Sequence, residues 1–458
     1  MLENILTSPY FIWPVSIIAA CFLFSLAVFI HEFGHFIAAR LLGLRADVFS
    51  IGFGPALWKR QIGATELRLS AIPFGGYVSL PQLDPDGMKQ IQGDHGETLP
   101  PATPWRRIIV AVAGPLGNVV LAVVCAAMIA WFSPIEATGA STEVGYVETN
   151  SSGWNAGIRR GDKILAVNDE VVNSWTSFMT ECFLSGGTND VVRITYQRGA
   201  DTHTAEAVLD QKISETESIY GVSGLRPGPL ALGISEVTPD SPAERVGLKE
   251  GDIILKINGV NFDAFEQLTQ MPNPAEQVTL EILRKKETLT FKVTPEVLPE
   301  FGDTPKMGVA LAFFAKANFQ WMVERGIYAQ LKSDVMGVVR VLRALTAPKT
   351  EGERGRAAKG LGGPLMIFTV FIQVIQTGLW VSLGFLRLIC MNLAILNLLP
   401  LPVLDGGHIL FASCAVICRR ELPPKVISWI TTAFSVLLIG AMIWFLFADV
   451  RRMVLQFF

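Results

Sequence analysis

The sequence has 458 residues, of which 50% are hydrophobic and only 17% charged, and its mean hydropathy is +0.40. This composition excludes an ordinary soluble globular protein and predicts a membrane protein. The formal net charge is −3, without the basic excess that a nucleic-acid-binding chain carries.

Four apolar stretches are long enough to cross a bilayer, which takes about 20 helical residues. Three of them, 4–30, 108–132 and 426–448, contain no Asp, Glu, Lys or Arg. The fourth, 361–404, is interrupted only by Arg387 and is too long for one span, so we expect a helix near 378–399 with further apolar structure before it. The sequence therefore predicts a polytopic α-helical membrane protein with four transmembrane helices.

These stretches divide the chain into segments. In chain order we expect a first transmembrane segment at 1–42, a β region and loop at 43–107, a second transmembrane helix at 108–132, two small domains at 133–222 and 223–310, amphipathic linker helices at 311–360, a third transmembrane segment at 361–418 and a fourth transmembrane helix at 426–448.

The first chemically informative motif is His31-Glu32-Phe-Gly34-His35, at the end of the first span. Residues four apart share one helix face, so the two imidazoles can hold one Zn²⁺ while Glu32 reaches a water molecule beside the metal. Three ionisable side chains on an otherwise apolar membrane helix are costly, which favours a metal site over a chance match. Gly34 can allow close approach of another helix.

The segment that follows predicts a β-hairpin and an orientation in the membrane. Residues 66–80 alternate in part and contain a Pro-Phe-Gly-Gly turn. Basic residues crowd the connection between the first two spans, which places it in the cytoplasm and the N-terminus outside. Four spans then put residues 133–310 outside. These basic residues are Arg40, Arg45, Lys59, Arg60, Arg68, Lys89, Arg106 and Arg107.

Residues 133–310 are acidic and contain an internal repeat. They hold 15 Lys and Arg against 26 Asp and Glu, whereas the rest of the chain has a basic excess, a distribution that argues against nucleic acid as a partner. Residues 151–168 align with 241–258 at an offset of 90, which predicts two copies of one small domain. The matched pairs are Gly157 with Gly247, Gly161 with Gly251, Asp162 with Asp252 and Asn168 with Asn258.

Each copy has a short helix ending at a glycine, a Gly-Asp turn, an alternating strand and an Asn-centred turn. This pattern resembles the α/β PDZ domains of bacterial proteases. PDZ domains can add a peptide ligand to a sheet edge. The alternative, that both domains only exclude bulky proteins from the membrane site, is equally open.

A catalytic zinc site usually has three protein ligands and one position for water, so the two histidines need a partner. The best candidate is Asp405, in the motif that runs from Asn397 to His408. Pro400 and Pro402 end the third span and leave backbone groups that need partners. The alternatives are that Asp405 only caps the following helix, or that His408 is the third ligand.

Two segments before the third span are less informative. Residues 319–345 place apolar side chains at helical spacing between basic ones, which predicts an amphipathic helix on the outer membrane surface. Residues 360–364, Gly-Leu-Gly-Gly-Pro, form a hinge-like motif to which the sequence assigns no task.

Together, the HExxH motif, the NxxPxPxxDG motif on the third span and the tandem PDZ-like repeat resemble the site-2 protease family, in particular its bacterial sigma-E regulators. The resemblance covers nearly the whole chain. It implies an intramembrane zinc metalloendopeptidase of the bacterial inner membrane, with periplasmic PDZ domains and an active site towards the cytoplasm. It also implies His31, His35 and Asp405 as Zn²⁺ ligands, Glu32 as general base and Asn397 as a contact to the substrate backbone.

The implied substrates are single-span membrane proteins in the lipid bilayer, namely anti-sigma factors of the envelope stress response that a first protease has already cut, and remnant signal peptides. A helical span must unwind before its carbonyl reaches the metal, and unwound backbone in lipid needs new hydrogen-bond partners. The hairpin at 66–80 can supply a strand edge, and the family's matching segment resembles a membrane-reentrant hairpin; an ordinary cytoplasmic hairpin is the alternative. The candidate substrate contacts are Asn397, Pro400, Pro402, Gly75, Gly76 and Tyr77.

The sequence leaves open the role of Asn397 and two other classes of function. Asn397 can donate to a developing oxyanion or hold the substrate strand. A catalytically silent PDZ-bearing scaffold would keep the repeat without needing a metal. A metal transporter would usually place polar residues along several spans, whereas here they cluster at one end.

Overall fold

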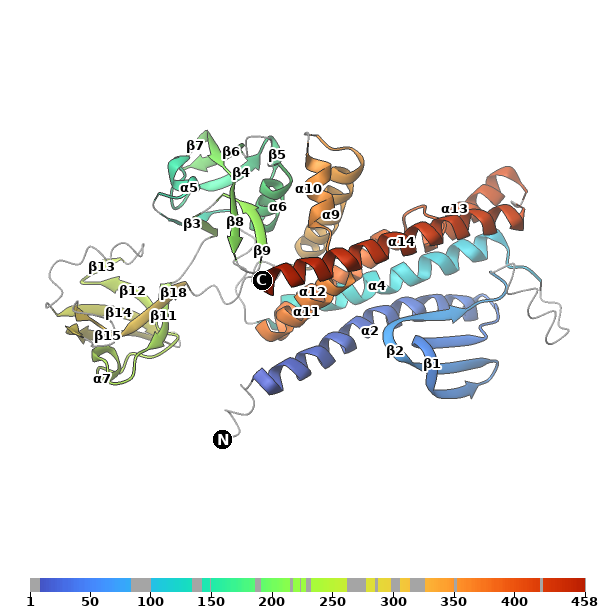
Figure 1. Cartoon of the computed structure of the whole chain (residues 1–458), viewed down its shortest axis with the longest axis horizontal. Helices are drawn as coiled ribbons and strands as arrows, with labels where there is room; N and C mark the ends of the chain where they lie inside the picture. The colour runs from blue at the N-terminus through green and yellow to red at the C-terminus, as the bar shows by residue number, and fades with distance from the viewer. Residues whose placement is uncertain are drawn as a thin grey trace. The chain divides into compact units, whose positions relative to one another are not determined.

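The computed structural model of the chain (Figure 1) forms two compact units. The helical unit comprises Met1–Ala137, Ser214–Glu217 and Met322–Phe458, and the β-rich unit comprises Thr138–Ile213 and Ser218–Trp321. The residues that the structure describes are 9–83, 100–133, 142–148, 150–185, 191–214, 217–222, 224–227, 232–261, 277–284, 287–297, 305–313, 326–349, 352–420 and 423–457.

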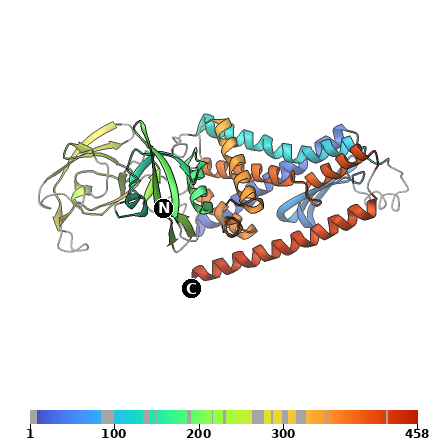
Figure 2. The same ribbon diagram turned by 90° about the horizontal axis from the view of Figure 1, so that it is seen from above.

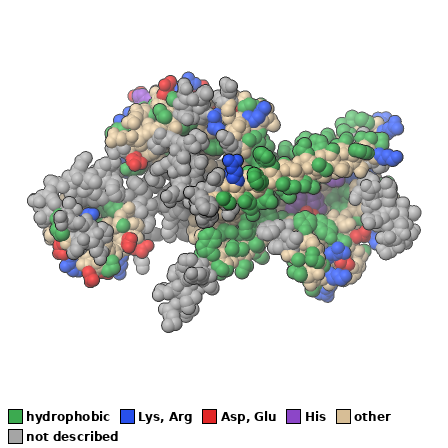
Figure 3. Space-filling view, in the orientation of Figure 1, with side chains coloured by type: hydrophobic (Ala, Val, Ile, Leu, Met, Phe, Trp, Pro, Cys, Tyr) green, Lys and Arg blue, Asp and Glu red, His purple; other side chains and the backbone are tan. Residues whose placement is uncertain are grey.

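Within the described residues, four helices are long and apolar enough to cross a membrane, as the sequence predicts. They are α2 (Pro9–Leu41), α4 (Pro104–Phe132), α12 (Leu379–Asn397) and α14 (Pro424–Phe457) (Figure 2). Two shorter apolar helices, α11 (Pro364–Thr377) and α13 (Asp405–Cys418), lie before and after α12 in the chain. Hydrophobic side chains cover most of the visible face of these helices (Figure 3).

Glycines bring the backbones of α2 and α4 into contact. A Cβ atom at Gly34 would lie 2.2 Å from the carbonyl oxygen of Ala113, and one at Gly117 would lie 2.7 Å from that of Ile30. Neither distance leaves room for a side chain. This is the small-residue packing by which membrane helices approach closely, as Gly34 predicts.

The two strands of the helical unit form a bent hairpin. β1 (Val48–Ile62) and β2 (Thr65–Ser79) pair along two stretches: residues 48–51 run opposite to 76–79 on one side and in the same direction as 66–69 on the other. Residues 66–69 and 76–79 run in opposite directions, so the chain reverses between them, at the Pro-Phe-Gly-Gly sequence, as the sequence predicts. Gly75, with φ 110°, lies at this reversal against the ring of Phe53, and Gly63, with φ 62°, lies at a second reversal that the sequence interpretation did not include.

The β-rich unit contains the two repeat copies. The first copy comprises β3 (Val144–Val147), α5 (Ser152–Asn155), β4 (Lys163–Val167), β5 (Glu170–Val171), α6 (Trp175–Ser185), β6 (Val191–Arg198), β7 (Asp201–Val208), β8 (Asp210–Ser214), β9 (Glu217–Gly221) and β10 (Leu225–Pro227). The second comprises β11 (Leu232–Val237), α7 (Pro242–Arg245), β12 (Ile253–Ile257), β13 (Val260–Asn261), β14 (Val278–Arg284), β15 (Glu287–Val293), β16 (Glu296–Val297), β17 (Pro305–Lys306) and β18 (Val309–Phe313).

The strand pairing extends each copy beyond the C-terminal boundary that the sequence predicts. The first has a sheet in the order β5-β4-β6-β7, and its β3 pairs with β10, which lies beyond the expected end at residue 222. In the second, β15, β14, β12, β11 and β18 are neighbours in that order, so this copy reaches residue 313 instead of 310. The ends of the two copies are defined by pairing between strands that are distant in the sequence, and a local sequence pattern does not reveal such pairing.

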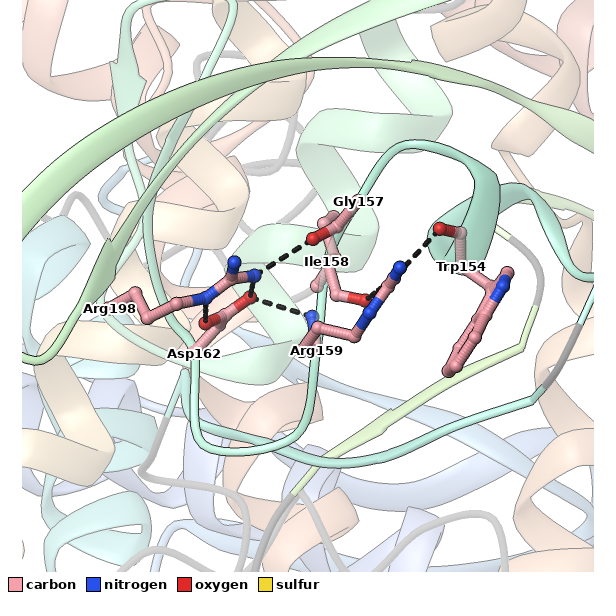
Figure 4. A network of polar contacts seen from close by, with 6 residues as sticks. All are labelled: Trp154, Gly157, Ile158, Arg159, Asp162 and Arg198. Carbon is pink, nitrogen blue, oxygen red and sulfur yellow. Dashed lines mark hydrogen bonds and ion pairs between the residues drawn. The ribbon is translucent and has the colours of Figure 1, made fainter. Parts of the chain in front are cut away.

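A buried aspartate at the equivalent position of each copy stabilises the connection between the short helix and the strand that follows it. In the first, Arg198 donates two hydrogen bonds of 2.7 Å to Asp162 and one of 2.8 Å to the carbonyl of Gly157 (Figure 4). Asp162 also accepts a hydrogen bond from the backbone N–H of Arg159. The hydrogen bond to Asp162 raises the pKa of Arg198 above its ordinary value.

The second copy repeats these contacts residue for residue. Arg284 donates two hydrogen bonds of 2.6 Å to Asp252 and one of 2.8 Å to the carbonyl of Gly247. Asn168 and Asn258, which the repeat also pairs, both adopt positive φ and accept a backbone hydrogen bond from the next strand. The 90-residue repeat is therefore present in the structure as well as in the sequence.

Helix α9 (Ile327–Thr346) is followed by α10 (Glu353–Gly360), and its contacts differ from the expectation of a surface helix at 319–345. Gln330 donates a hydrogen bond to the carbonyl of Ala126 on α4, and Asp334 pairs with Arg387 on α12 at 2.6 and 3.1 Å. The Arg387 side chain is 3% exposed and that of Asp334 6%. This face of α9 is therefore buried against protein. Residues 319–325 lie outside the described residues.

Helix α14 is attached near its C-terminal end by a carboxylate. No residue of its most apolar stretch is buried in the isolated chain, whereas Asp449 is buried. The Asp449 oxygens accept hydrogen bonds of 3.0 and 3.1 Å from the backbone N–H groups of Gly363 and Met366, at the start of α11, where a helix has N–H groups without internal partners. A Cβ at Gly363 would lie 2.4 Å from this carboxylate. Gly363, in the motif at 360–364, thus binds the Asp449 carboxylate through its N–H and leaves the space that the carboxylate occupies.

Replacing Gly363 with alanine is expected to displace Asp449 and to lower the free energy of unfolding by about 1–3 kcal/mol, because buried N–H groups lose their acceptor. Thermal unfolding of the purified protein in detergent measures this. Gly440→Ala, in α14 itself, is the matched control, because nothing lies within 4 Å of a Cβ there. Equal unfolding temperatures for the two variants would contradict the prediction.

Candidate metal centre

Three predicted ligands converge in the helical unit. His31 and His35 lie one turn apart on α2, and Asp405 is the first residue of α13. The two Nε2 atoms are 3.3 Å apart, His31 Nε2 is 3.2 Å from Asp405 Oδ2, and His35 Nε2 is 3.3 Å from Asp405 Oδ1. One possible ligand atom from each of the three residues lies within 4.8 Å of the others. Histidine side chains are visible inside a hollow of this unit (Figure 3).

These separations fit a tetrahedral zinc ion. Zn–N and Zn–O distances of about 2.0–2.1 Å place two ligand atoms of a tetrahedral site about 3.3 Å apart. Asp405 Oδ2 is buried and faces His31, yet it makes no hydrogen bond to any described residue. A cation held between the two imidazoles and the carboxylate would satisfy that oxygen. The donor set and its spacing therefore fit Zn²⁺.

The close contact of α2 with α4 also orients His35. Its Nδ1 donates a hydrogen bond of 2.7 Å to the carbonyl of Val110, which leaves Nε2 free to bind a metal. A Cβ at Gly114 would lie 2.2 Å from His35 Nε2, so this position on α4 must lack a side chain. The ring of His35 is thus oriented by the carbonyl acceptor of Val110, and it fits there because Gly114 has no side chain.

A tight turn between α12 and α13 places Asp405. A Cβ at Gly406 would lie 2.0 Å from the carbonyl oxygen of Leu399, so the turn folds directly over the start of α13. The N-cap residue of α13 is Leu404, and no side chain caps the helix, so the alternative role of Asp405 as a cap is not observed. His408, the alternative ligand, is exposed and does not belong to the cluster of donor atoms.

A cavity of about 280 Å³ adjoins these residues. Of the expected catalytic and substrate-binding residues, Glu32, Asn397, Gly75 and Gly76 line it. The structure does not bring Pro400, Pro402 or Tyr77 to its wall. The lining residues are Val28, His31, Glu32, Gly75, Gly76, Asn118, Leu393, Asn397, Val403, Leu404 and Asp405.

The polar residues of the cavity face the imidazoles. The backbone N–H of Val78 in β2 lies beside the carboxylate of Glu32, and a Cβ at Gly76 would lie 3.3 Å from Glu32 Cγ. Asn397 Nδ2 lies 3.3 Å from His31 Nε2. The hydroxyl of Tyr77 instead accepts a hydrogen bond of 3.2 Å from Arg68, away from the cavity wall.

The sequence interpretation did not include Asn118, which is fully buried on α4 with Nδ2 3.3 Å from His31 Nδ1. A signal was available, because Asn118 is the one amide in the uncharged stretch 108–132. Polar groups inside a membrane span are costly and usually serve a function.

Comparison with known proteins identifies the class to which this site belongs. Peptidase family M50 matches residues 19–441 of the chain. A protein of Neisseria meningitidis serogroup A, named as a candidate zinc metalloprotease, is 31% identical over 428 residues, which cover 90% of this chain and 93% of that protein. The chain belongs to peptidase family M50, the site-2 protease family.

Two further relatives carry more specific names. The regulator of sigma-E protease RseP of Escherichia coli is 29% identical over 476 aligned residues, covering 97% of this chain and 99% of that protein. Protease RseP of Yersinia pestis is 28% identical over 466, covering 95% and 98%. The chain is therefore an intramembrane zinc metalloprotease that acts on membrane proteins in the lipid bilayer. The expected activity and cofactor are confirmed.

Replacing Gly114 with alanine is expected to lower zinc affinity about 10–100-fold without altering a ligand, because the new Cβ would displace the ring of His35. Elemental analysis and chelator competition on the purified protein measure this, with His35→Ala as the reference for loss of metal. Leu116→Ala, an exposed position on the same helix, is the matched control. Wild-type affinity in Gly114→Ala would show that the ring does not depend on this gap.

Proposed function

We propose that this protease cleaves locally unwound transmembrane segments of single-span membrane proteins, with zinc held by His31, His35 and Asp405 and with Glu32 as general base. One observation carries the proposal. A cluster of metal-binding atoms, a carboxylate and the edge of a β-sheet border the same cavity between apolar helices.

Each residue has a chemical task in peptide hydrolysis. When bound, Zn²⁺ supplies a Lewis acid that activates water and polarises the scissile carbonyl. Glu32, adjacent to His31 in the chain, accepts a proton from the attacking water and transfers it to the leaving amine as the C–N bond breaks. The backbone N–H of Val78, beside this carboxylate, is the donor that would hold Glu32 in the cavity for this transfer.

Asn397 supports the reaction as a hydrogen-bond donor. Its Nδ2 lies 3.3 Å from His31 Nε2, so the amide borders the space where a scissile carbonyl would meet the metal. An amide N–H at that distance from the metal ligands can stabilise negative charge on the carbonyl oxygen. This position favours the oxyanion role over a purely strand-holding one.

The outer edge of the hairpin can receive an unwound substrate. Residues 76–79 pair with 48–51 on one side, and within the described residues no strand pairs with their other side. Backbone groups alternate in direction along a strand, so Gly76 has its N–H and C=O on the same side as Val78, whose N–H meets Glu32. A substrate strand added there would recover the hydrogen bonds that its helix loses in lipid.

The proposed setting follows from charge and from the relatives. The basic loop between the first two spans supports a cytoplasmic side for the active site and a periplasmic side for the repeat, in a bacterial inner membrane. The name of the Escherichia coli relative, regulator of sigma-E protease, supports a part in regulating a sigma factor. Pre-cleaved anti-sigma factors and remnant signal peptides are the substrates proposed within that setting. The two repeat copies would act as PDZ domains, either by binding peptides or by limiting the size of proteins that enter.

Glu32→Gln is expected to fold and to bind about one zinc per chain but to lose turnover, because an amide cannot accept the proton of the attacking water. Co-expression with tagged single-span substrates measures this, since remnants should accumulate with the variant and not with the wild type. A catalytically silent scaffold would give the same remnants with both proteins. Normal cleavage by Glu32→Gln would rule out this mechanism.

Substrate spans that contain Gly or Pro near the cleavage site are expected to be cut faster than uniformly leucine-rich spans, because they unwind at lower cost. Paired substrates with identical flanking sequences, compared in one membrane preparation, measure the ratio of rates. Equal rates for the two spans would contradict binding in an extended conformation.

A further inference from the structure

The amide of Asn118 lies on the side of His31 that faces away from the other two ligands. His31 Nε2 points at His35 Nε2 and Asp405, whereas its Nδ1 lies 3.3 Å from Asn118 Nδ2. Asn118 is 0% exposed and lines the cavity. It is therefore a buried polar group in contact with a metal-binding residue, on a helix that contributes no metal ligand of its own to the cluster.

The cluster determines where the proton of His31 must be. A neutral imidazole has one N–H and one lone pair, and the lone pair must be on the nitrogen that binds metal. Because Nε2 faces the cluster, Nδ1 carries the proton. His35 has the same arrangement, and there Nδ1–H donates to the carbonyl of Val110, which can only accept.

A protonated Nδ1 on His31 needs an acceptor, and Asn118 can supply one. With Nδ2 towards the ring, donor would face donor, while Asn118 Oδ1 is buried and has no hydrogen bond among the described residues. The two ends of an amide have nearly the same shape, and a half-turn about χ2 exchanges them. That half-turn brings Oδ1 to the ring N–H and gives the unpartnered oxygen its hydrogen bond.

We propose that Asn118 is a positioning residue of the zinc site, whose Oδ1 accepts a hydrogen bond from His31 Nδ1–H and thereby fixes the ring so that Nε2 points at the metal. The inference rests on the proposed metal site. Groups that hold a ligand imidazole in this way typically contribute about 10–100-fold to metal affinity. Asn118 then does for His31 what the carbonyl of Val110 does for His35.

Zinc affinity of three variants tests the proposal by chelator competition on the full-length protein in detergent. Asn118→Leu keeps the approximate size but removes the acceptor, and it should bind zinc about 10–100-fold more weakly. Asn118→Asp keeps an acceptor and should bind at least as tightly as wild type. Leu116→Ala, at an exposed position on the same helix, is the matched control, and its zinc affinity should stay within a few-fold of wild type.

The outcomes separate this inference from the proposed function. If the wild type binds no zinc, or His35→Ala binds it equally well, the metal site itself is wrong. If zinc binds and depends on His35 while Asn118→Leu matches the wild type, only the role of Asn118 is overturned. Equal weakening by Asn118→Leu and Asn118→Asp would indicate a packing role and overturn it as well.

A spectroscopic measurement covers the case in which Asn118→Leu does not fold. The chain has five histidines, so ¹⁵N-histidine labelling gives few signals. In the zinc-loaded wild type, His31 Nδ1 should appear protonated and hydrogen-bonded, and it should remain so in Asn118→Asp. An unprotonated or non-hydrogen-bonded His31 Nδ1 in the wild type would overturn the proposal.

Discussion

The direct backbone contact between α2 and α4 is the constraint on which the site depends. Gly34 and Gly117 allow the two helices to touch, and Gly114 leaves the gap that the ring of His35 occupies. At this separation α4 can offer the carbonyl of Val110 to one imidazole and the amide of Asn118 to the other. A side chain at any of these glycines would separate α2 from the groups that orient its ligands. The metal site is thus a property of the helix pair as much as of the HExxH motif.

The clustering of the three proposed ligands could be predicted from the sequence because it depends on local rules. Helix periodicity brings His31 and His35 to one face, and the cost of a carboxylate beside an apolar span marks Asp405 as functional. The full topology of the β segment could not be predicted in this way. The turn at the Pro-Phe-Gly-Gly sequence follows from local turn chemistry, but the pairing of residues 48–51 with two separate segments of β2 leaves no local pattern in the sequence.

Two other features were missed for a shared physical reason. An amphipathic pattern shows that α9 has an apolar and a polar face, but a membrane surface and a protein groove satisfy that pattern equally well. Asn118 is neutral, so it does not stand out as the charged residues of the spans do. Its importance depends on what lies opposite it, and that is known only once α2 and α4 are placed together.

The buried pair of Arg387 and Asp334 bears on how the chain is made. An arginine at the middle of a span costs about 2.5–3.5 kcal/mol during insertion into the bilayer if it meets lipid alone. Arg387 lies near the middle of α12, and two of its partners, Asp334 and Gln330, come from α9, which is synthesised earlier. Gln330 in turn binds α4, an earlier helix again. The groups that neutralise the arginine are therefore already present in the chain when its own helix is synthesised.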